Sequence, residues 1–272
     1  MKKKLIVLSF ITAFSFAFYA CDEDTPMPEP EVPVVDDYTP VHVKKVLIED
    51  YTATWCGYCP RVASAIEQVL QQSNNVVAVA VHSDEDMGYP YVSNMATTYS
   101  IPGFPTGYID RSFEWPYPES ISGLNAAINK KAPLGIKIET SIADGNANIK
   151  VSIQYATTIT SITRLVVCLL EDKVIANQVN YYNDGRGNPI VDYEHNHVLR
   201  VAATDIFGDN IPASITVKDN ISTHQFSIPV SSYNAENCSV VAFATKGISN
   251  VLNVQSVKLG ETKDFDYIEQ EK

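Results

Sequence analysis

Between residues 41 and 132, short apolar runs alternate with stretches in which apolar residues recur at helical spacing. The runs at 46–48 and 76–81 are almost continuously apolar, which is typical of strands in a sheet covered on both faces. Between these runs the apolar positions recur every three or four residues and predict an amphipathic helix: Val62, Ile66, Val69 and Leu70.

Three further elements follow in the same stretch. The pattern predicts helices over 91–99 and 120–131, and a strand over 107–113 that leads into a tight turn. The resulting order of strands and helices indicates an α/β domain over residues 41–133.

After Pro133 the pattern changes to strands only. Short alternating runs separated by turn residues predict an all-β sandwich over residues 134–265, followed by an acidic tail over 266–272. Residues 177–207 are polar and rich in Asn, Asp and Tyr, so we expect one long connection there. The expected strands cover 135–142, 147–155, 165–170, 224–230, 240–245 and 252–258.

The N-terminus has the features of an export signal. Lysines at positions 2–4 precede an apolar run over 5–20, and Cys21 follows the small residue Ala20. This arrangement resembles a bacterial lipoprotein signal, although Phe18 and Tyr19 depart from its usual residues. We therefore predict a signal peptide over 1–20 and acylation of Cys21, which would hold the protein at a membrane. The alternative is an ordinary secretory signal that leaves Cys21 as a free thiol.

Residues 21–40 contain several prolines among acidic residues, a composition that favours an extended tether. The acidic run 22–24 resembles the surface-export signal of Bacteroidetes lipoproteins, so we expect an outer membrane protein exposed on the outer face. The alternative is a plain solvated linker. The formal net charge is −12 and becomes more negative when the signal lysines are removed. An acidic surface repels nucleic acid, so nucleic acid is not an expected partner.

The strongest chemical signal is the run Trp55-Cys56-Gly57-Tyr58-Cys59-Pro60, which lies between a predicted strand and a predicted helix. Unpaired N–H groups and the helix dipole at a helix N-terminus favour a thiolate. Cys56 is therefore the expected nucleophile, and Cys59, one helical turn later, is the expected resolving thiol. Pro60 fits the first helical turn, where a missing N–H costs little.

This run resembles the active site of the thioredoxin family. The resemblance implies a buried carboxylate at Asp50 that assists proton transfer to and from Cys59. It also implies a cis-proline loop at Pro105, where the backbone of Phe104 pairs with an extended substrate. The substrate would contact the residues around the motif and the loop: Trp55, Gly57, Tyr58, Phe104 and Thr106.

Structural roles without catalysis are the alternatives for these residues. Cys56 and Cys59 could form a purely structural disulfide. Asp50 could be a solvated residue at a strand end, since Glu49 beside it is equally acidic. A zinc site is disfavoured, because it needs further ligands and His82 supplies at most one.

Most of the chain resembles the Omp-type outer membrane lipoproteins of Bacteroidetes, the family related to a twenty-eight-kilodalton outer membrane protein. The resemblance rests on the residues already named and on the segments 80–82, 170–172 and 193–200. It implies a thioredoxin-like domain followed by an immunoglobulin-like sandwich.

Four residues of the second part have chemistry of their own. Cys168 and Cys238 lie on two expected strands, where they would form either an inter-sheet disulfide or two separate buried thiols. His195 and His197 alternate at an expected strand end, and we favour packing against Tyr181 and Tyr182 over metal binding.

Two functions follow from the sequence. The first is an extracytoplasmic thiol-disulfide oxidoreductase that acts on protein or peptide thiols and disulfides. It would need no bound cofactor, because no flavin or nicotinamide motif is present, but it would need an external electron donor or acceptor. The second is a surface-exposed binding or adhesin-type lipoprotein that uses the thioredoxin-like domain as a scaffold.

Overall fold

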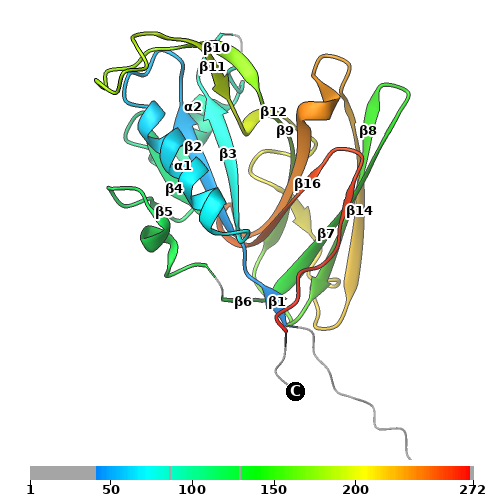
Figure 1. Ribbon diagram of the computed structural model, residues 1–272. Coiled ribbons are helices and arrows are strands. Elements are labelled where there is room, and N and C mark those ends of the chain that lie inside the picture. Colours follow the sequence, from blue (N-terminus) through cyan, green and yellow to red (C-terminus); the bar gives the residue numbers. More distant parts are fainter. Residues whose placement is uncertain (1–40, 86, 129, 270–272) are drawn as a thin grey trace, which may run out of the picture. The chain divides into compact units, whose positions relative to one another are not determined.

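The computed structural model describes residues 41–269, apart from 86 and 129. The predicted signal over 1–20, the lipidation residue Cys21, the tether to residue 40 and the last residues of the acidic tail lie outside this part. The described residues form one compact unit. The described residues contain two helical elements of more than one turn, α1 and α2, and are otherwise mostly strands (Figure 1).

The N-terminal part is thioredoxin-like, as the sequence predicts. Strand β2 pairs in parallel with β3 on one side and antiparallel with β4 on the other, and β5 continues the sheet beyond β4. The elements are β2 (Val46–Thr52), α1 (Pro60–Gln72), β3 (Val76–His82), α2 (Val92–Thr98), β4 (Thr106–Ile109) and β5 (Phe113–Glu114).

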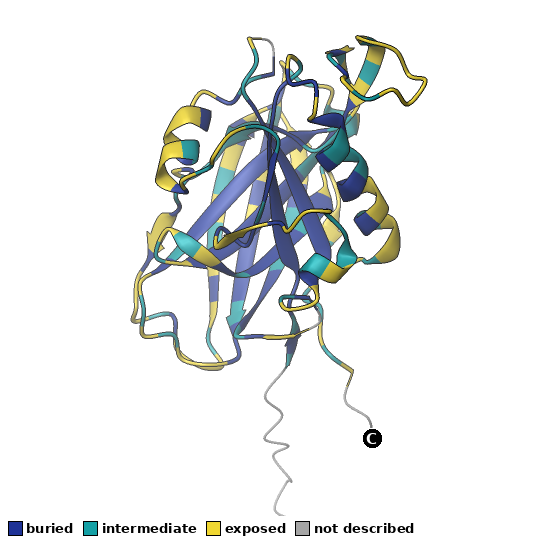
Figure 2. Ribbon diagram, turned by 90° about the vertical axis from the view of Figure 1, so that its left-hand side faces the viewer, coloured by how far each residue is buried: buried dark blue, intermediate teal, exposed yellow. Residues whose placement is uncertain are grey.

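The two helices cover opposite faces of this sheet because side chains alternate along each strand. Val46 and Ile48 of β2 share a core with α1, whereas Leu47 and Tyr51 share a core with α2. All seven residues of β2 are buried, which explains its near-continuous apolar sequence. The inner strands are accordingly buried, while the outer faces of the helices are exposed (Figure 2).

The C-terminal part is the predicted β-sandwich. One layer is a four-stranded sheet in the order β14-β8-β7-β17, and the other contains β9, β15 and β16. Side chains of the two layers meet in one apolar core that includes Ile136, Val151, Leu169 and Val240. The strands are β7 (Leu134–Ala143), β8 (Asn146–Tyr155), β9 (Thr163–Glu171), β14 (Ile221–Pro229), β15 (Cys238–Lys246), β16 (Ser249–Lys258) and β17 (Thr262–Lys263).

One sheet runs through both parts of the molecule. Strand β12 (Val198–Ala202) lies between β3 and β9, parallel to the first and antiparallel to the second. The sheet therefore has the order β16-β15-β9-β12-β3-β2-β4-β5, with β13 (Asp209–Ile211) also paired to β9. The boundary expected after residue 133 falls just before β7, and as a domain boundary it stays a prediction.

Two sequence expectations need correction. Among the described residues of 120–131, the helical structure is a single 3₁₀ turn, Ile121–Leu124, in place of the expected helix. Trp115 is fully buried, its Nε1 donates to the Ser120 carbonyl, and its ring lies close against Gly123, so this segment is packed on the Trp115 side chain. The chain then enters β6 (Lys131–Ala132), which pairs with β1 (His42–Val43).

The second correction concerns residues 177–207, which are not one irregular connection. They complete a hairpin of β10 (Val174–Gln178) and β11 (Ile190–His195), and they also contain β12. Most residues of β10 and β11 are exposed or half-buried. The hairpin consequently lacks the apolar alternation by which strands are recognised in a sequence.

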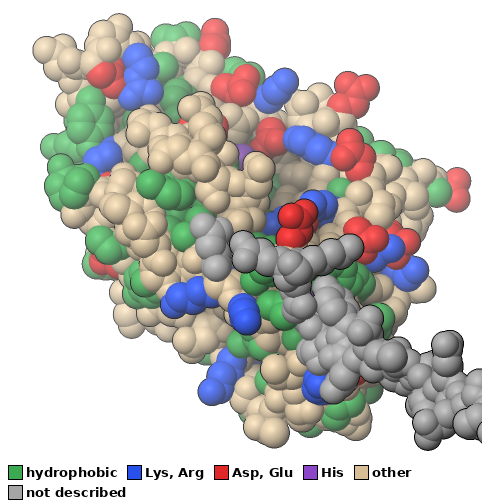
Figure 3. Space-filling model, turned by 60° about the horizontal axis from the view of Figure 1, so that its bottom comes forward, with side chains coloured by type: hydrophobic (Ala, Val, Ile, Leu, Met, Phe, Trp, Pro, Cys, Tyr) green, Lys and Arg blue, Asp and Glu red, His purple; other side chains and the backbone are tan. Residues whose placement is uncertain are grey.

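The described residues include no helix long and apolar enough to cross a membrane. On the face of the molecule seen in Figure 3, basic and acidic side chains lie close together and do not form a region of one sign. Ion pairs between surface side chains of the described residues include Lys137 with Asp264 and Lys263 with Asp266.

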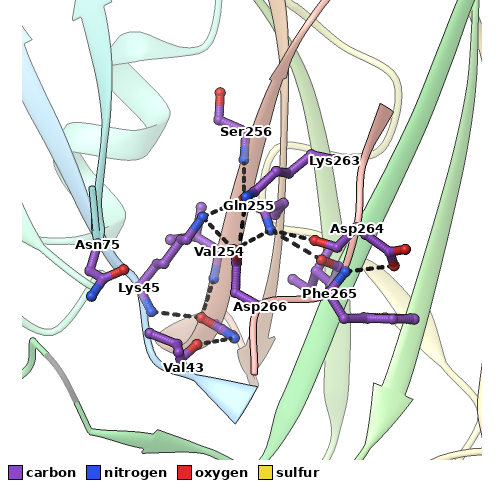
Figure 4. Close-up of polar contacts among 12 residues, drawn as sticks. Val43, Lys45, Asn75, Val254, Gln255, Ser256, Lys263, Asp264, Phe265 and Asp266 are labelled. Atoms are coloured by element: carbon purple, nitrogen blue, oxygen red, sulfur yellow. Dashed lines mark hydrogen bonds and ion pairs between the residues drawn. The ribbon is translucent and has the colours of Figure 1, made fainter. Parts of the chain in front are cut away.

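A polar cluster joins the start of β2, strand β16 and the C-terminal segment (Figure 4). Lys45 Nζ donates to Gln255 Oε1 at 2.7 Å and pairs with Asp266 Oδ2 at 2.6 Å. The backbone N–H of Lys45 donates to Asn253 Oδ1, whose Nδ2 in turn donates to the Val43 carbonyl. The Lys45 amine is largely buried, so these partners compensate for its lost hydration.

Asp266→Asn tests this cluster. Burial alone would raise the pKa of Asp266, but hydrogen bonds from Lys45, Gln255 and Lys263 hold it at about 2. The unfolded chain binds this proton near pH 4, so the stabilisation is present above pH 4 and lost as the pH falls toward 2. We expect the variant to unfold more easily by about 1 kcal/mol at pH 7, after allowing for solvent screening. Urea titrations at pH 7 and pH 2.5 measure this, and equal loss at both pH values would contradict it.

Candidate functional site

The Cys-Gly-Tyr-Cys motif lies between the end of β2 and the start of α1. Cys56 and Cys59 form a disulfide with a Cα–Cα distance of 5.4 Å. Cys59 is the N-cap residue of α1, and Pro60 occupies the first turn, where the missing N–H removes no helical hydrogen bond. Cys56 is 6% exposed and Cys59 1% exposed, so Cys56 is the more accessible sulfur.

Asp50 lies on β2 and is 2% exposed. Its Oδ1 atom has no hydrogen-bond partner among the described residues. Burial raises the pKa of Asp50 to about 8, and the negative charge of Glu119 adds to the increase. A carboxyl with such a pKa can both accept and release a proton near neutral pH.

Glu49, the neighbouring carboxylate, has a different environment. Alternation along β2 places it on the opposite face from Asp50, where Arg111 NH2 pairs with its Oε1 at 2.7 Å. The Arg111 guanidinium also lies over the rings of Tyr99 and Phe243. Glu49 is therefore part of a buried ion pair away from the disulfide.

The loop over 103–106 packs against the disulfide. The Phe104–Pro105 peptide bond is cis, and the Phe104 side chain packs on the small cluster of Ala53, Cys56 and Cys59. The Trp55 ring lies 5.9 Å from that of Phe104, and Trp55 Nε1 donates to the Ser83 carbonyl. Thr106 Oγ1 donates to the Gly103 carbonyl at 2.8 Å, which holds the ends of the loop together.

The β10–β11 hairpin supplies contacts to the motif that the sequence does not predict. Gln178 Nε2 lies within hydrogen-bond distance of the carbonyl oxygens of Ala53, Thr54 and Cys56. The N–H of Val179 donates to Thr54, and that of Tyr181 donates to Gly57, so the chain after β10 runs along the motif. Gln178 is a buried amide in a polar stretch, and no local pattern distinguishes it from a solvated side chain.

Gly57 leaves room for a side chain of this hairpin. A Cβ atom on Gly57 would lie 2.4 Å from the Tyr181 ring, so any larger residue there would displace that ring. Tyr58, which is 54% exposed, makes edge contacts with the rings of Tyr181 and Tyr182. Trp55, Tyr58 and Tyr181 thus form an exposed aromatic rim around the disulfide.

A cavity of about 190 Å³ lies behind the disulfide, between α1, β3 and the hairpin. Asp50 and Cys59 line its inner end, and His195 also borders it. Glu67 and Glu194, which are exposed, border the same cavity, so it reaches from the buried carboxyl toward the surface.

The histidines of this region pack differently from the sequence expectation. His195 lies edge-on to His82 at 5.2 Å and to Tyr193 at 4.8 Å, not against Tyr181 and Tyr182. His82 Nδ1 forms a 2.7 Å hydrogen bond with Asp84. In the described part of the chain, no group of three or more His, Cys, Asp or Glu side chains is arranged to hold a metal ion.

Cys168 and Cys238 are free, buried thiols, so the expected alternative of an inter-sheet disulfide is wrong. Both lie on adjacent strands of the same sheet, and Cys168 is paired in register with Val241. Cys238 is three positions from Val241, and an odd offset directs its side chain to the opposite face. Cys168 belongs to the core under α2 and Cys238 to the sandwich core.

The chain is similar in fold to a solved structure from another bacterium. HBP35 of Porphyromonas gingivalis superimposes with a TM-score of 0.64 at 21% sequence identity, covering 80% of this chain and 76% of that one. A β-glucosidase from Kluyveromyces marxianus reaches a TM-score of only 0.25, at 9% identity over 51% of this chain and 15% of that one. Among curated proteins nothing matches.

Two family models match the sequence. The thioredoxin model matches residues 36–129, which include β2, both helices, the disulfide and Pro105. The model described as outer membrane protein Omp28 matches residues 93–263, from α2 to the end of the sandwich. Because this second match covers more than half of the chain, the protein belongs to the Omp28 family of outer membrane proteins.

Proposed function

We propose that this outer membrane protein is a thiol-disulfide oxidoreductase that works through Cys56 and Cys59. One observation carries the proposal: the disulfide lies at the N-terminus of α1, and the buried Asp50, with a pKa of about 8, lines the same cavity as Cys59. A buried, unpaired carboxyl lowers the stability of the folded protein, and a purely structural disulfide does not need one. A redox pair needs such a group to move a proton.

The reaction in the reducing direction has two steps. The Cys56 thiolate attacks a substrate disulfide, forms a mixed disulfide and releases one substrate thiolate. Asp50 releases its own proton, its carboxylate then takes the proton of Cys59, and the Cys59 sulfur attacks Cys56 Sγ. The bond between Cys56 and the substrate breaks, the second substrate thiolate leaves, and the substrate is reduced as the protein pair is oxidised. An external donor of two electrons restores the dithiol, and the oxidising direction reverses each step.

The substrate class that fits the site is an extended protein or peptide segment that carries a cysteine. Phe104, Pro105 and Thr106 offer a backbone edge beside the disulfide, of the kind that pairs with an extended chain. Trp55 and Tyr58 are more than half exposed next to it and offer apolar contacts to neighbouring side chains. Acylation of Cys21 would fix this activity to the outer membrane.

Replacement of the two cysteines tests the proposal. We expect Cys56→Ser to slow reduction of a disulfide-linked peptide roughly a thousandfold, because the attacking sulfur is lost. Cys59→Ser retains the attack but cannot resolve it, so a stable mixed disulfide between Cys56 and the peptide should accumulate. Peptide fluorescence and intact mass measure the two results.

Cys168→Ala is the matched control. Cys168 is fully buried, and burial raises the pKa of its thiol to about 12, so its removal should leave turnover unchanged. Equal turnover by Cys56→Ser and the unsubstituted protein would contradict the proposal. It would favour the second function, in which the thioredoxin-like part is a scaffold of a surface-binding protein.

A further inference from the structure

Two buried polar atoms that line the cavity behind the disulfide have neither a hydrogen-bond partner nor an ion-pair partner among the described residues. These are Asp50 Oδ1 and Nε2 of His195, whose side chains are 2% and 5% exposed. They come from strands more than a hundred residues apart in the chain, and both residues line the same space. Since one water molecule occupies about 30 Å³, the cavity has room for a short chain of waters between them.

The hydrogen-bonding characters of the two groups are complementary. The Ala176 backbone accepts a hydrogen bond from the His195 ring, and because Nε2 is unpartnered the donor is Nδ1. In the neutral ring Nε2 is therefore the acceptor atom. Burial and the neighbouring His82 lower the pKa of His195 to about 4, so the ring is neutral near pH 7. Asp50 is protonated at that pH and is a donor.

Titratable groups surround His195 on every side that packs against it. They come from β2, α1, β3 with the residues after it, and β11 with the residues after it: Asp50, Glu67, His82, Asp84, Tyr193, Glu194 and His197. His82 is hydrogen-bonded to Asp84, and Glu67 lies 3.5 Å from His197 at the outer end of the cavity. The Glu67 side chain is half exposed, so a proton that reaches it is in contact with solvent.

We propose that this cavity is the route by which the proton on Asp50 exchanges with solvent, and that His195 relays it. The inference rests on the proposed redox function and adds a residue from the β-sandwich part of the chain to it. His195 does not touch the reacting sulfurs. It accepts a hydrogen bond from the cavity water through Nε2 and so orders the path from Asp50 to the rim.

The proton balance of the resolving step defines what the relay does. Asp50 is protonated at rest, so its proton first moves through the water chain past His195 to the rim at Glu67 and into solvent. The carboxylate that results takes the proton of Cys59 as Cys59 attacks the mixed disulfide, and the two electrons of the Cys56–substrate bond leave with the substrate sulfur. His195 is neutral before and after the step, so no net charge remains in the cavity.

His195→Asn and His195→Gln separate this role from packing. An Asn side chain can still donate to the Ala176 carbonyl but lacks an atom at the Nε2 position, whereas the longer Gln places an amide oxygen near that position. His224→Asn is the matched control, because His224 is also partly buried but lies on β14 in the other sheet.

The experiment uses the purified full-length protein in its reduced form with Ellman's reagent. Attack by Cys56 releases the first thionitrobenzoate, and attack by Cys59 on the resulting mixed disulfide releases the second. In weak buffer we expect His195→Asn to slow the second release roughly tenfold and to leave the first unchanged. Added imidazole, which carries protons, should restore the rate, and His195→Gln should recover most of it without imidazole.

Each outcome separates the relay from the redox function. A second release that is as fast in His195→Asn as in the unsubstituted protein, while Asp50→Asn slows it, overturns the relay and leaves the redox function standing. Slowing that neither imidazole nor His195→Gln corrects means that His195 only packs, and it also overturns the relay. A second release that persists in Cys59→Ser contradicts the redox function itself.

Discussion

Asp50→Asn should slow the resolving step of thiol-disulfide exchange roughly a hundredfold, and it should also make the oxidised protein more stable. The rate falls because an amide cannot take the proton of Cys59. Release of the second thionitrobenzoate from the reduced protein measures this rate, and the first release by Cys56 is the internal reference. An unchanged second release would show that Asp50 takes no part in proton transfer.

The stability gain follows from the same pKa. The folded protein holds the Asp50 proton up to a pH of about 8, whereas the unfolded chain releases it near pH 4. Between these values the unfolded state binds fewer protons, so the free energy of unfolding falls as the pH rises. Asp50→Asn removes this penalty, which amounts to about 4 kcal/mol at pH 7 and disappears below pH 4.

Urea titrations of the oxidised protein at pH 4 and pH 7 test the gain. Asp219→Asn is the control, because Asp219 lies in an exposed turn and its side chain is 61% exposed. We expect Asp50→Asn to exceed the unsubstituted protein in stability at pH 7 but not at pH 4. If the difference between the two proteins is the same at both pH values, the Asp50 carboxyl is already ionised in the folded protein.

Arg111→Met should destabilise the protein by about 3–5 kcal/mol, because it leaves the Glu49 carboxylate buried without its partner. Both side chains of this pair are almost completely buried. Burial alone would lower the pKa of Arg111, but the Glu49 charge keeps the guanidinium ionised. Arg111 NH1 also donates to the Ile206 carbonyl, so the residue joins the thioredoxin-like part to the segment after β12.

Two further variants make this result specific. Lys150→Met removes an exposed ion pair with Glu139 on β7 and β8 and should have little effect. Glu49→Gln combined with Arg111→Met should recover part of the loss, because no unpaired charge then remains. If Arg111→Met and Lys150→Met were equally stable, the buried pair would contribute nothing. Urea unfolding at pH 7 measures all three.

The local pattern of apolar and polar residues predicted the strands and α1 well. It did not predict which strands pair with one another. The runs at 46–48 and 76–81 became β2 and β3 because strands buried on both faces are continuously apolar. The pairing of Val198 with Ala80, by contrast, joins strands more than a hundred residues apart. No periodicity within either strand specifies that partner, so the shared sheet could not be predicted.

Some residues of the site could be predicted from the sequence and others could not. Cys56 and Cys59 were predictable from their spacing at one strand-to-helix junction, and Asp50 was predictable from the resemblance to the thioredoxin family. Gln178 and His195 were not, because they reach the motif through a hairpin whose residues are mostly polar and exposed. The disulfide alternative for Cys168 and Cys238 failed because strand assignment alone does not reveal which face each thiol occupies.

The reduction potential of the Cys56–Cys59 pair tests the redox function most directly. The purified protein would be equilibrated in glutathione buffers of graded ratio, and its free thiols would be trapped by alkylation and counted by mass. We predict a potential within the range of roughly −120 to −270 mV that is found for thiol-disulfide catalysts, with Cys56 alkylated first. A potential below about −300 mV, with both thiols slow to react, would identify a structural bridge and contradict the account.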